Sequence, residues 1–284
     1  MKFGLHLQVG PKRWAELTRE AERTGFESVW MPEHLIMPVQ MSGRPGSPHE
    51  GTPPISGETP AWDVWESIAW LAAQTSTIRF GTNVYNIGLR HPFATARALT
   101  TADMLSGGRI EFGIGASWLK EEWDAMELPF ETRGRRVDES IRIIQRLFVE
   151  DMVEHDGEFF HFRPVQFLPK PVQDPWPPML IGGDSPAALR RAALLGDGWL
   201  PMAQTIDTFP GNLRRIGALR EDAGRQGRFE VSVFRFGPPT LELIRRYEEA
   251  GADRVLVAPW ESPRDAVDGI RRFGDEVLSV LGGA

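Results

Sequence analysis

Strand-like and helix-like segments alternate along almost the whole chain, and this alternation limits the folds open to it. Eight short apolar segments, each followed by a helical pattern, are expected to be strands. They span residues 2–9, 28–31, 78–85, 110–114, 178–181, 198–202, 230–236 and 254–258. Repeated strand–helix–strand units predict a parallel sheet, and eight of them predict a closed (β/α)8 TIM barrel. An open, doubly wound sheet is the alternative.

Proline and glycine mark several of the intervening helices. Pro92 suits a first helical turn, and Gly25 and Gly107 stand just past expected helix ends. The helices are expected over residues 11–24, 62–75, 93–105, 133–148, 186–195, 208–224, 240–250 and 263–281. Residues 38–60 are rich in Pro, Gly and Ser and predict a long binding loop, and residues 158–167 predict a small β excursion. Because no interdomain linker is evident, we expect residues 1–284 to form a single domain.

Composition and charge exclude several classes of partner. A formal net charge of -7 argues against nucleic acid as a ligand. The absence of cysteine excludes disulfides, a thiolate nucleophile and thiolate metal ligands. We expect no metal site, since metal-binding His spacings are missing and His49, His155 and His161 fall in expected loops. No signal peptide or membrane-spanning run is apparent, which predicts a cytoplasmic protein without a membrane partner.

Polar residues follow the strands at their carboxyl ends, where barrel enzymes place their active sites. Glu33 and His34 follow the second strand, and a carboxylate beside an imidazole can move protons near neutral pH. A capping glutamate and a packed histidine would give the same pattern. His6 shares one face of the first strand with Gly4 and would point into the barrel, beside a ligand or as a hydrogen-bonded core residue.

Two glycine-bearing strand ends precede helices, and such loops can bind a phosphate through backbone N–H groups. Their candidate binding residues are Gly115, Ala116, Ser117, Gly182, Gly183, Asp184 and Ser185. The first loop is not a dinucleotide fingerprint, because the third glycine is missing. Arg90 precedes a helix start and is either solvated or a contact for an anionic cofactor. Asn83 and Val84 end the third strand and by themselves are an ordinary strand dipeptide.

Taken in order, these segments resemble the luciferase-like flavin and deazaflavin oxidoreductases, and most of all their coenzyme F-420-dependent branch. The resemblance covers nearly the whole chain. The motifs that carry it are Trp30-Met31-Pro32-Glu33-His34, Gly81-Thr82-Asn83-Val84, Arg90-His91-Pro92, residues 105–118, residues 133–139, residues 181–186 and Leu195-Gly196-Asp197-Gly198-Trp199. Each motif is weak alone, and the ordered series is specific.

The resemblance implies a cofactor at the carboxyl face of the barrel, with a non-prolyl cis peptide bond at Asn83-Val84 behind its tricyclic ring. The loop after Gly115 and the loop of residues 182–185 would bind the cofactor phosphate. His34, beside Glu33, would donate or accept a proton. This chain departs from the pattern at Ala116-Ser117, where relatives are glycine-rich, and at Glu33, where some deazaflavin enzymes have Asp.

The function that follows is hydride transfer between coenzyme F-420 and a small organic substrate. The loop of residues 38–60 and Trp62, Trp65 and Trp118 would line the substrate site. The alternatives are an FMN-dependent monooxygenase that uses O₂ and, from another class, a non-catalytic flavin-binding barrel. A basic groove leading from the phosphate would favour the deazaflavin, because its tail is acidic. The resemblance also implies a homodimer that associates through helices on one side of the barrel.

Overall fold

Eight parallel strands close into a barrel in the computed structural model, which describes residues 1–42, 55–202, 205–235 and 237–281. The barrel strands are β1 (Lys2–His6), β2 (Ser28–Met31), β3 (Arg79–Thr82), β5 (Ile110–Gly115), β8 (Met179–Gly182), β9 (Gly198–Leu200), β10 (Glu230–Arg235) and β11 (Arg254–Val257). β1 pairs with both β2 and β11, and β3 pairs with both β2 and β5, so the ring has no edge. The predicted closed barrel is confirmed, and the open sheet is wrong.

The third strand is interrupted at the carboxyl end of the barrel. β3 ends at Thr82, and the short strand β4 (Tyr85–Asn86) resumes pairing with the last residues of β5. The Asn83-Val84 peptide bond between them is cis, as the resemblance implies. The single strand expected over residues 78–85 is therefore two pieces around a two-residue break.

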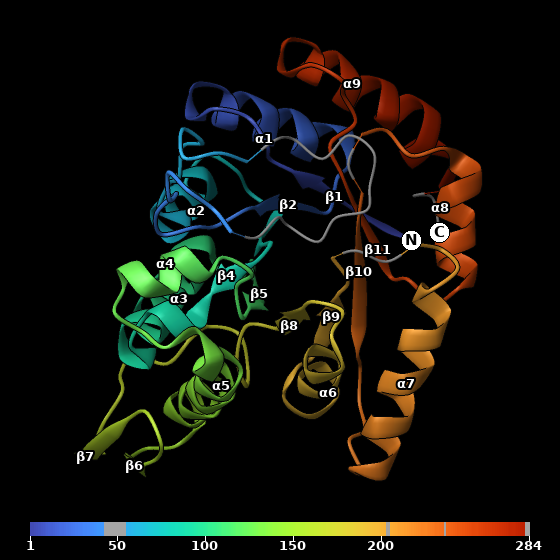
Figure 1. Cartoon of the computed structure of the whole chain (residues 1–284). Helices are drawn as coiled ribbons and strands as arrows, with labels where there is room; N and C mark the ends of the chain where they lie inside the picture. Colours follow the sequence, from blue (N-terminus) through green and yellow to red (C-terminus); the bar gives the residue numbers. More distant parts are fainter. Residues whose placement is uncertain (43–54, 203–204, 236, 282–284) are drawn as a thin grey trace.

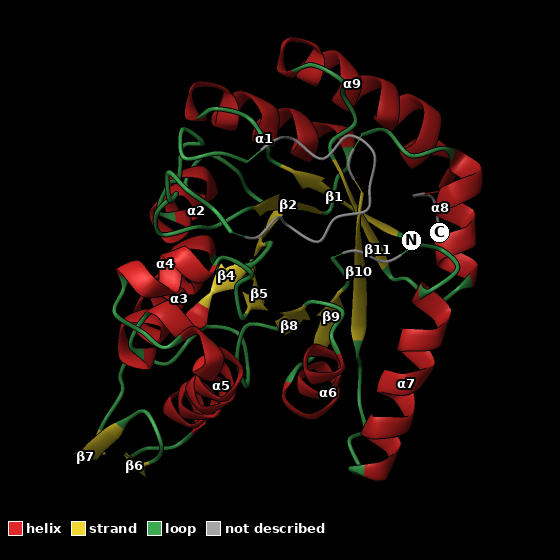
Figure 2. Cartoon of the chain, viewed as in Figure 1, coloured by secondary structure: helices red, strands yellow, loops and turns green. Residues whose placement is uncertain are grey.

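Helices surround the barrel (Figure 2). The α-helices are α1 (Trp14–Thr24), α2 (Val64–Ala72), α3 (Pro92–Ser106), α4 (Lys120–Ala125), α5 (Arg133–Val149), α6 (Pro186–Leu195), α7 (Phe209–Asp222), α8 (Leu241–Glu249), α9 (Ala266–Phe273) and α10 (Ser279–Leu281). Short 3-10 turns cover Pro11–Arg13, Ile87–Leu89, Phe130–Thr132 and Pro263–Asp265, and a π-helical turn covers Gly274–Leu278. Within the described residues, no helix combines the length and the apolar character needed to cross a membrane.

Two elements differ from the predicted order. The short helix α4 was not predicted. A hairpin of β6 (Val153–Asp156) and β7 (His161–Val165) projects at the periphery (Figure 1). β7 confirms the small β excursion predicted over residues 158–167, whereas β6, with His155, replaces an expected loop.

Large and charged side chains fill the lower barrel interior. Trp30 is fully buried there, and Cβ atoms added at Gly4 and Gly81 would lie 2.8 Å and 2.4 Å from its ring. Beneath it, the buried Arg254 guanidinium makes hydrogen bonds of 2.7 Å and 2.8 Å to the two carboxylate oxygens of Glu111. Room for a ligand inside the barrel is thus restricted to its carboxyl end, above Trp30.

Candidate active site

Two buried polar side chains at the carboxyl end of the barrel have no hydrogen-bond partner among the described residues: His6 and Asn83. His6 ends β1, and its ring centroid lies 4.3 Å from that of Phe234. Burial lowers the pKa of His6 to about 3, so this imidazole is neutral at physiological pH. Because buried polar atoms are seldom left unpaired, the two side chains fit a ligand with polar groups at its edge.

Val84 packs on the barrel cluster that contains Trp30 and Phe234. A Cβ atom at Gly115 would lie 2.4 Å from Val84 Cγ2, and one at Gly182 would lie 2.7 Å from Val84 Cγ1. The sequence predicts that the loops containing these glycines bind a phosphate through backbone N–H groups. The structure gives both glycines a packing reason as well: a side chain at either position would collide with Val84.

The Glu33 carboxylate is buried and paired. Its Oε1 accepts a 2.7 Å hydrogen bond from Arg90 Nη2, and its Oε2 accepts one of 2.8 Å from the backbone N–H of Asn86. Burial raises the pKa of Glu33, and the Arg90 charge opposes that rise. Arg90 lies 4.5 Å from the Tyr85 ring centroid, and its Nη1 is buried without a partner in the described part of the chain. Glu33 therefore fixes Arg90 beside β4, with one donor left to offer a ligand.

His34 faces a different carboxylate, one that the sequence analysis missed. Its Nδ1 lies 3.2 Å from Glu122 Oε2, on α4, and its ring stands edge-on to Trp118 with centroids 5.9 Å apart. The expected pairing of His34 with Glu33 is thus replaced by a pairing with Glu122. Both residues lie in the loop after β2, where Glu33 meets Arg90 and His34 meets Glu122.

The loop after Gly115 is held by its own hydrogen bonds. Ser117 has φ 62°, and its Oγ accepts a 3.2 Å bond from the backbone N–H of Leu119. Ala116 is half-buried and packs against the main core. This loop reaches α4 and so places Trp118 and Glu122 beside His34.

The second glycine loop leads into α6. The N–H of Gly183 donates to the carbonyl of Leu200, which removes it from the predicted set of phosphate donors. The Asp184 carboxylate accepts a 3.2 Å bond from the backbone N–H of Met202. Ser185 caps α6 by accepting a hydrogen bond from its first turn. We therefore expect any phosphate contact at this loop to be made by residues at the start of α6.

The three tryptophans expected at the substrate site lie in different environments. Trp118 is beside His34, as expected. Trp62 is 46% exposed. Trp65 is buried against Tyr85 and Phe112, so its expected role as a substrate contact is wrong; it lies on the face of α2 that packs on the barrel. Residues 43–54 of the predicted covering loop, including His49, lie outside the described residues.

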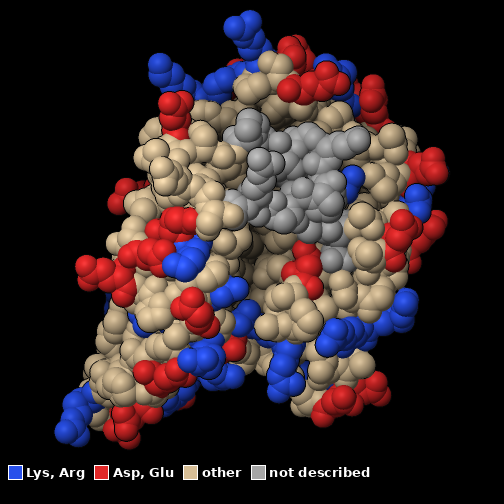
Figure 3. All heavy atoms as spheres, viewed as in Figure 1, with Lys and Arg blue, Asp and Glu red and all other residues tan. Residues whose placement is uncertain are grey.

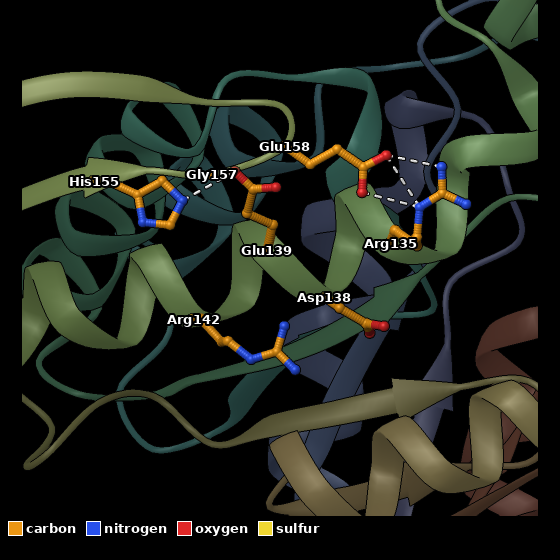
Figure 4. A pocket seen from close by; sticks show the side chains of 7 residues that line it. All are labelled: Arg135, Asp138, Glu139, Arg142, His155, Gly157 and Glu158. Atoms are coloured by element: carbon orange, nitrogen blue, oxygen red, sulfur yellow. Dashed lines mark hydrogen bonds and ion pairs between the residues drawn. The ribbon is translucent and has the colours of Figure 1, made fainter.

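A separate pocket of about 330 Å³ lies outside the barrel, between α5 and the β6–β7 hairpin (Figure 4). His155 Nε2 lies 2.9 Å from Glu139 Oε1, and Arg135 makes a 2.8 Å ion pair with Glu158. These pairs involve four of the side chains that line the pocket, and the pocket is not part of the site formed by the strand ends.

Basic side chains gather near α5, α6 and α7, with acidic ones among them, on the face shown in Figure 3. Arg191 on α6 hydrogen-bonds Asp138 and the carbonyl of Gly134 on α5, so the first two turns of the two helices lie side by side. Arg133 and Arg190 lie in these turns, and neither forms an ion pair within the described ranges; Arg133 contacts the carbonyl and ring of Phe130. This cluster can bind an acidic group.

The closed barrel and a site built from the carboxyl ends of its strands define a TIM-barrel enzyme. The chain belongs to the luciferase-like monooxygenase family, whose model matches residues 3–237.

Two curated relatives illustrate the sequence similarity. The chain is 31% identical over 241 residues to the uncharacterized protein Rv0940c of Mycobacterium tuberculosis, covering 85% of this chain and 83% of that one. It is 29% identical over 253 residues to an F420-dependent glucose-6-phosphate dehydrogenase of Kineococcus radiotolerans, covering 87% of this chain and 68% of that one.

Solved structures share the fold at low identity. A coenzyme F420 dependent tetrahydromethanopterin reductase from Methanopyrus kandleri superposes with a TM-score of 0.81 at 19% identity, covering 99% of both chains. The monooxygenase RslO1 from Streptomyces bottropensis superposes with a TM-score of 0.77 at 22% identity, also covering 99% of both chains.

Proposed function

We propose that this protein transfers a hydride between coenzyme F-420 and a small organic substrate. The observation that carries the proposal is the set of unpaired, buried polar atoms of His6 and Asn83 at the carboxyl end of the barrel. A deazaflavin ring has an apolar face and polar edges, which suits a site with apolar Val84 beside two polar side chains. The similarity to a relative described as F420-dependent supports the same choice.

His6, Asn83 and Val84 would hold the ring. Bound coenzyme F-420 supplies a two-electron centre that donates or accepts a hydride. The neutral His6 can donate through one ring nitrogen and accept through the other, and the Asn83 amide can do both as well. Phosphate contacts would come from Ala116, Ser117 and Ser185, with Arg133 and Arg190 near the acidic tail.

His34 would carry the proton that accompanies the hydride. It is partly exposed and stands beside Trp118, which can cover a substrate and exclude water. Glu33 acts less directly in this arrangement, since its carboxylate is occupied by Arg90 and Asn86. We therefore assign Glu33 to positioning Arg90, whose unpaired Nη1 is available for a polar group of the ligand.

Titration of the apo-protein with coenzyme F-420 and, in parallel, with FMN tests the proposal by quenching of tryptophan fluorescence. We expect micromolar or tighter binding of F-420 and a clear preference over FMN. Arg133→Glu should weaken F-420 binding, because it reverses a charge near the tail. Arg163→Glu makes the same change on the exposed hairpin strand β7 and should leave the affinity unchanged.

A preference for FMN would refute the deazaflavin assignment and support the alternative, an FMN-dependent monooxygenase; oxygen consumption would then be the assay. Tight F-420 binding without turnover across a panel of alcohols and carbonyl compounds would instead favour the non-catalytic barrel.

We also propose that the chain acts as a cytoplasmic homodimer and that residues 1–284 fold as one domain. These points stay predictions. Sedimentation equilibrium of the purified protein would test the dimer directly, and a single cooperative unfolding transition would support one domain.

A further inference from the structure

Glu122 is fully buried at the entrance to the candidate active site, and its carboxylate makes three contacts to one short segment. Its Oε1 accepts a 2.6 Å hydrogen bond from the backbone N–H of Leu35 and a longer one, of 3.4 Å, from that of Ile36. Its Oε2 lies 3.2 Å from His34 Nδ1. A buried carboxylate on α4 thus binds the loop that follows β2 and orients the imidazole at its start.

These contacts determine which ring nitrogen of His34 carries hydrogen. An ionised carboxylate only accepts hydrogen bonds, so a neutral imidazole that bonds to it must donate from Nδ1–H. The other nitrogen, Nε2, is then unprotonated. It has no hydrogen-bond partner among the described residues, and the side chain is 12% exposed.

We propose that Glu122 is a positioning residue that holds His34 in the Nδ1–H tautomer, so that Nε2 is the atom that exchanges a proton with the substrate. The inference rests on the proposed function only for the identity of the reaction. In the oxidative direction, the proton moves from the substrate to the lone pair of Nε2. The imidazolium that forms keeps its Nδ1–H directed at the Glu122 carboxylate, which stabilises the new charge. In the reductive direction, Nε2–H returns the proton.

The variant Glu122→Gln should reverse the tautomer without changing the shape of the side chain. Glutamine has one acceptor oxygen and one NH₂ group. The N–H groups of Leu35 and Ile36 require the oxygen, so the NH₂ group faces His34. Nδ1 must then accept a hydrogen bond, and the proton moves to Nε2. The unprotonated nitrogen is no longer available to the substrate.

The measurement is a long-range ¹H–¹⁵N correlation spectrum of the apo-protein labelled with [¹⁵N]histidine, recorded at a pH where His34 is neutral. Loss of one signal set in His34→Asn assigns this residue among the six histidines. In the wild type we expect Nδ1–H to exceed Nε2–H by roughly tenfold or more, the ratio that a hydrogen bond to a charged group supports. Glu122→Gln should invert the ratio.

Glu121→Gln is the matched control. Glu121 is the neighbouring residue of α4, and its Oε1 accepts a 2.6 Å bond from the backbone N–H of Ser42. Its contact is with the loop and not with His34, so this variant should keep the wild-type tautomer. Circular dichroism establishes that each variant is folded.

A wild-type His34 in the Nε2–H form would overturn the proposal, and so would an unchanged tautomer in folded Glu122→Gln. If that variant does not fold, the wild-type spectrum alone decides. Failure of the proposed function is a separate result: F-420 would not bind, while the tautomer and its inversion would remain as described.

Discussion

Acid should destabilise this protein through His6, the histidine buried at the carboxyl end of the barrel. Its pKa is lowered from 6.5 to about 3 by burial, so the imidazole stays neutral in the folded chain while it protonates in the unfolded chain below about pH 6.5. The unfolded state then binds more protons than the folded state, and stability falls as the pH falls. The perturbation we choose is His6→Gln, which removes the titrating group and keeps a polar side chain.

The magnitude follows from proton linkage between these two pKa values. The contribution of His6 is close to zero at pH 7, and at pH 5 it costs about 2 kcal/mol of folding free energy. It grows further until the pH nears 3. Between pH 7 and pH 5, the free energy of unfolding of His6→Gln should therefore fall by about 2 kcal/mol less than that of the wild type. Changes in packing against Phe234 shift the variant equally at both pH values and cancel in this difference.

Urea unfolding of the apo-protein at pH 7, 6 and 5, followed by tryptophan fluorescence, measures the difference. Phe234→Leu is the control, because it alters the packing around His6 and leaves the titrating ring in place. It should keep the pH dependence of the wild type. If His6→Gln has the same loss of stability with falling pH as the wild type, the reasoning is refuted. A His6 signal that titrates between pH 7 and pH 5 in the folded protein would refute it independently.

Three further predictions concern the barrel interior and the ligand. Gly81→Ala should cost about 1–3 kcal/mol of unfolding free energy, since its Cβ would lie 2.4 Å from the Trp30 ring. Gly217→Ala is the control in α7, where a Cβ would meet nothing within 4 Å, and it should raise the unfolding free energy by about 0.5–1 kcal/mol. Equal effects of the two variants in urea titrations would contradict the packing argument. Glu111→Gln should cost about 1.5–3 kcal/mol, because the buried Arg254 loses one charged bidentate partner and keeps its ion pairs with Glu27 and Glu230, and no measurable loss by thermal unfolding would rule this out. Asn83→Ala should weaken F-420 binding by about tenfold or more with little loss of stability, and an unchanged Kd would remove Asn83 from the site.

The barrel could be predicted from the sequence because its signals are local. Pro92 occupies the first turn of α3, and Gly107 ends that helix with φ 69°, a conformation that glycine adopts at little cost. Similar proline and glycine signals separate most strands from the helices that follow. Once eight strand–helix units are recognised, closure follows from general rules of parallel sheets and not from any single contact.

The elements that the sequence analysis missed lack such signals. The helix α4 has only six residues, too few for a clear hydrophobic periodicity, and it begins without a side-chain cap. The break between β3 and β4 is not marked by composition, because the strand-favouring residues Phe80, Thr82 and Tyr85 stand on both sides of it. The packing reason for Gly115 and Gly182 is likewise hidden in the sequence, because it is the side chain of Val84, in the break between β3 and β4.

The candidate site shows why adjacency in sequence is a poor guide to partners. Glu33 and His34 have the composition of an acid–base pair, yet Glu33 binds Arg90 and His34 faces Glu122, 57 and 88 positions further along the chain. Both partners are brought in by loops at the carboxyl ends of other strands. In a parallel barrel all such loops meet at one face, so each strand end contributes a residue whose partner comes from a neighbouring unit. The sequence can therefore name the residues of such a site, while their pairing depends on the order and spacing of the strands around the barrel.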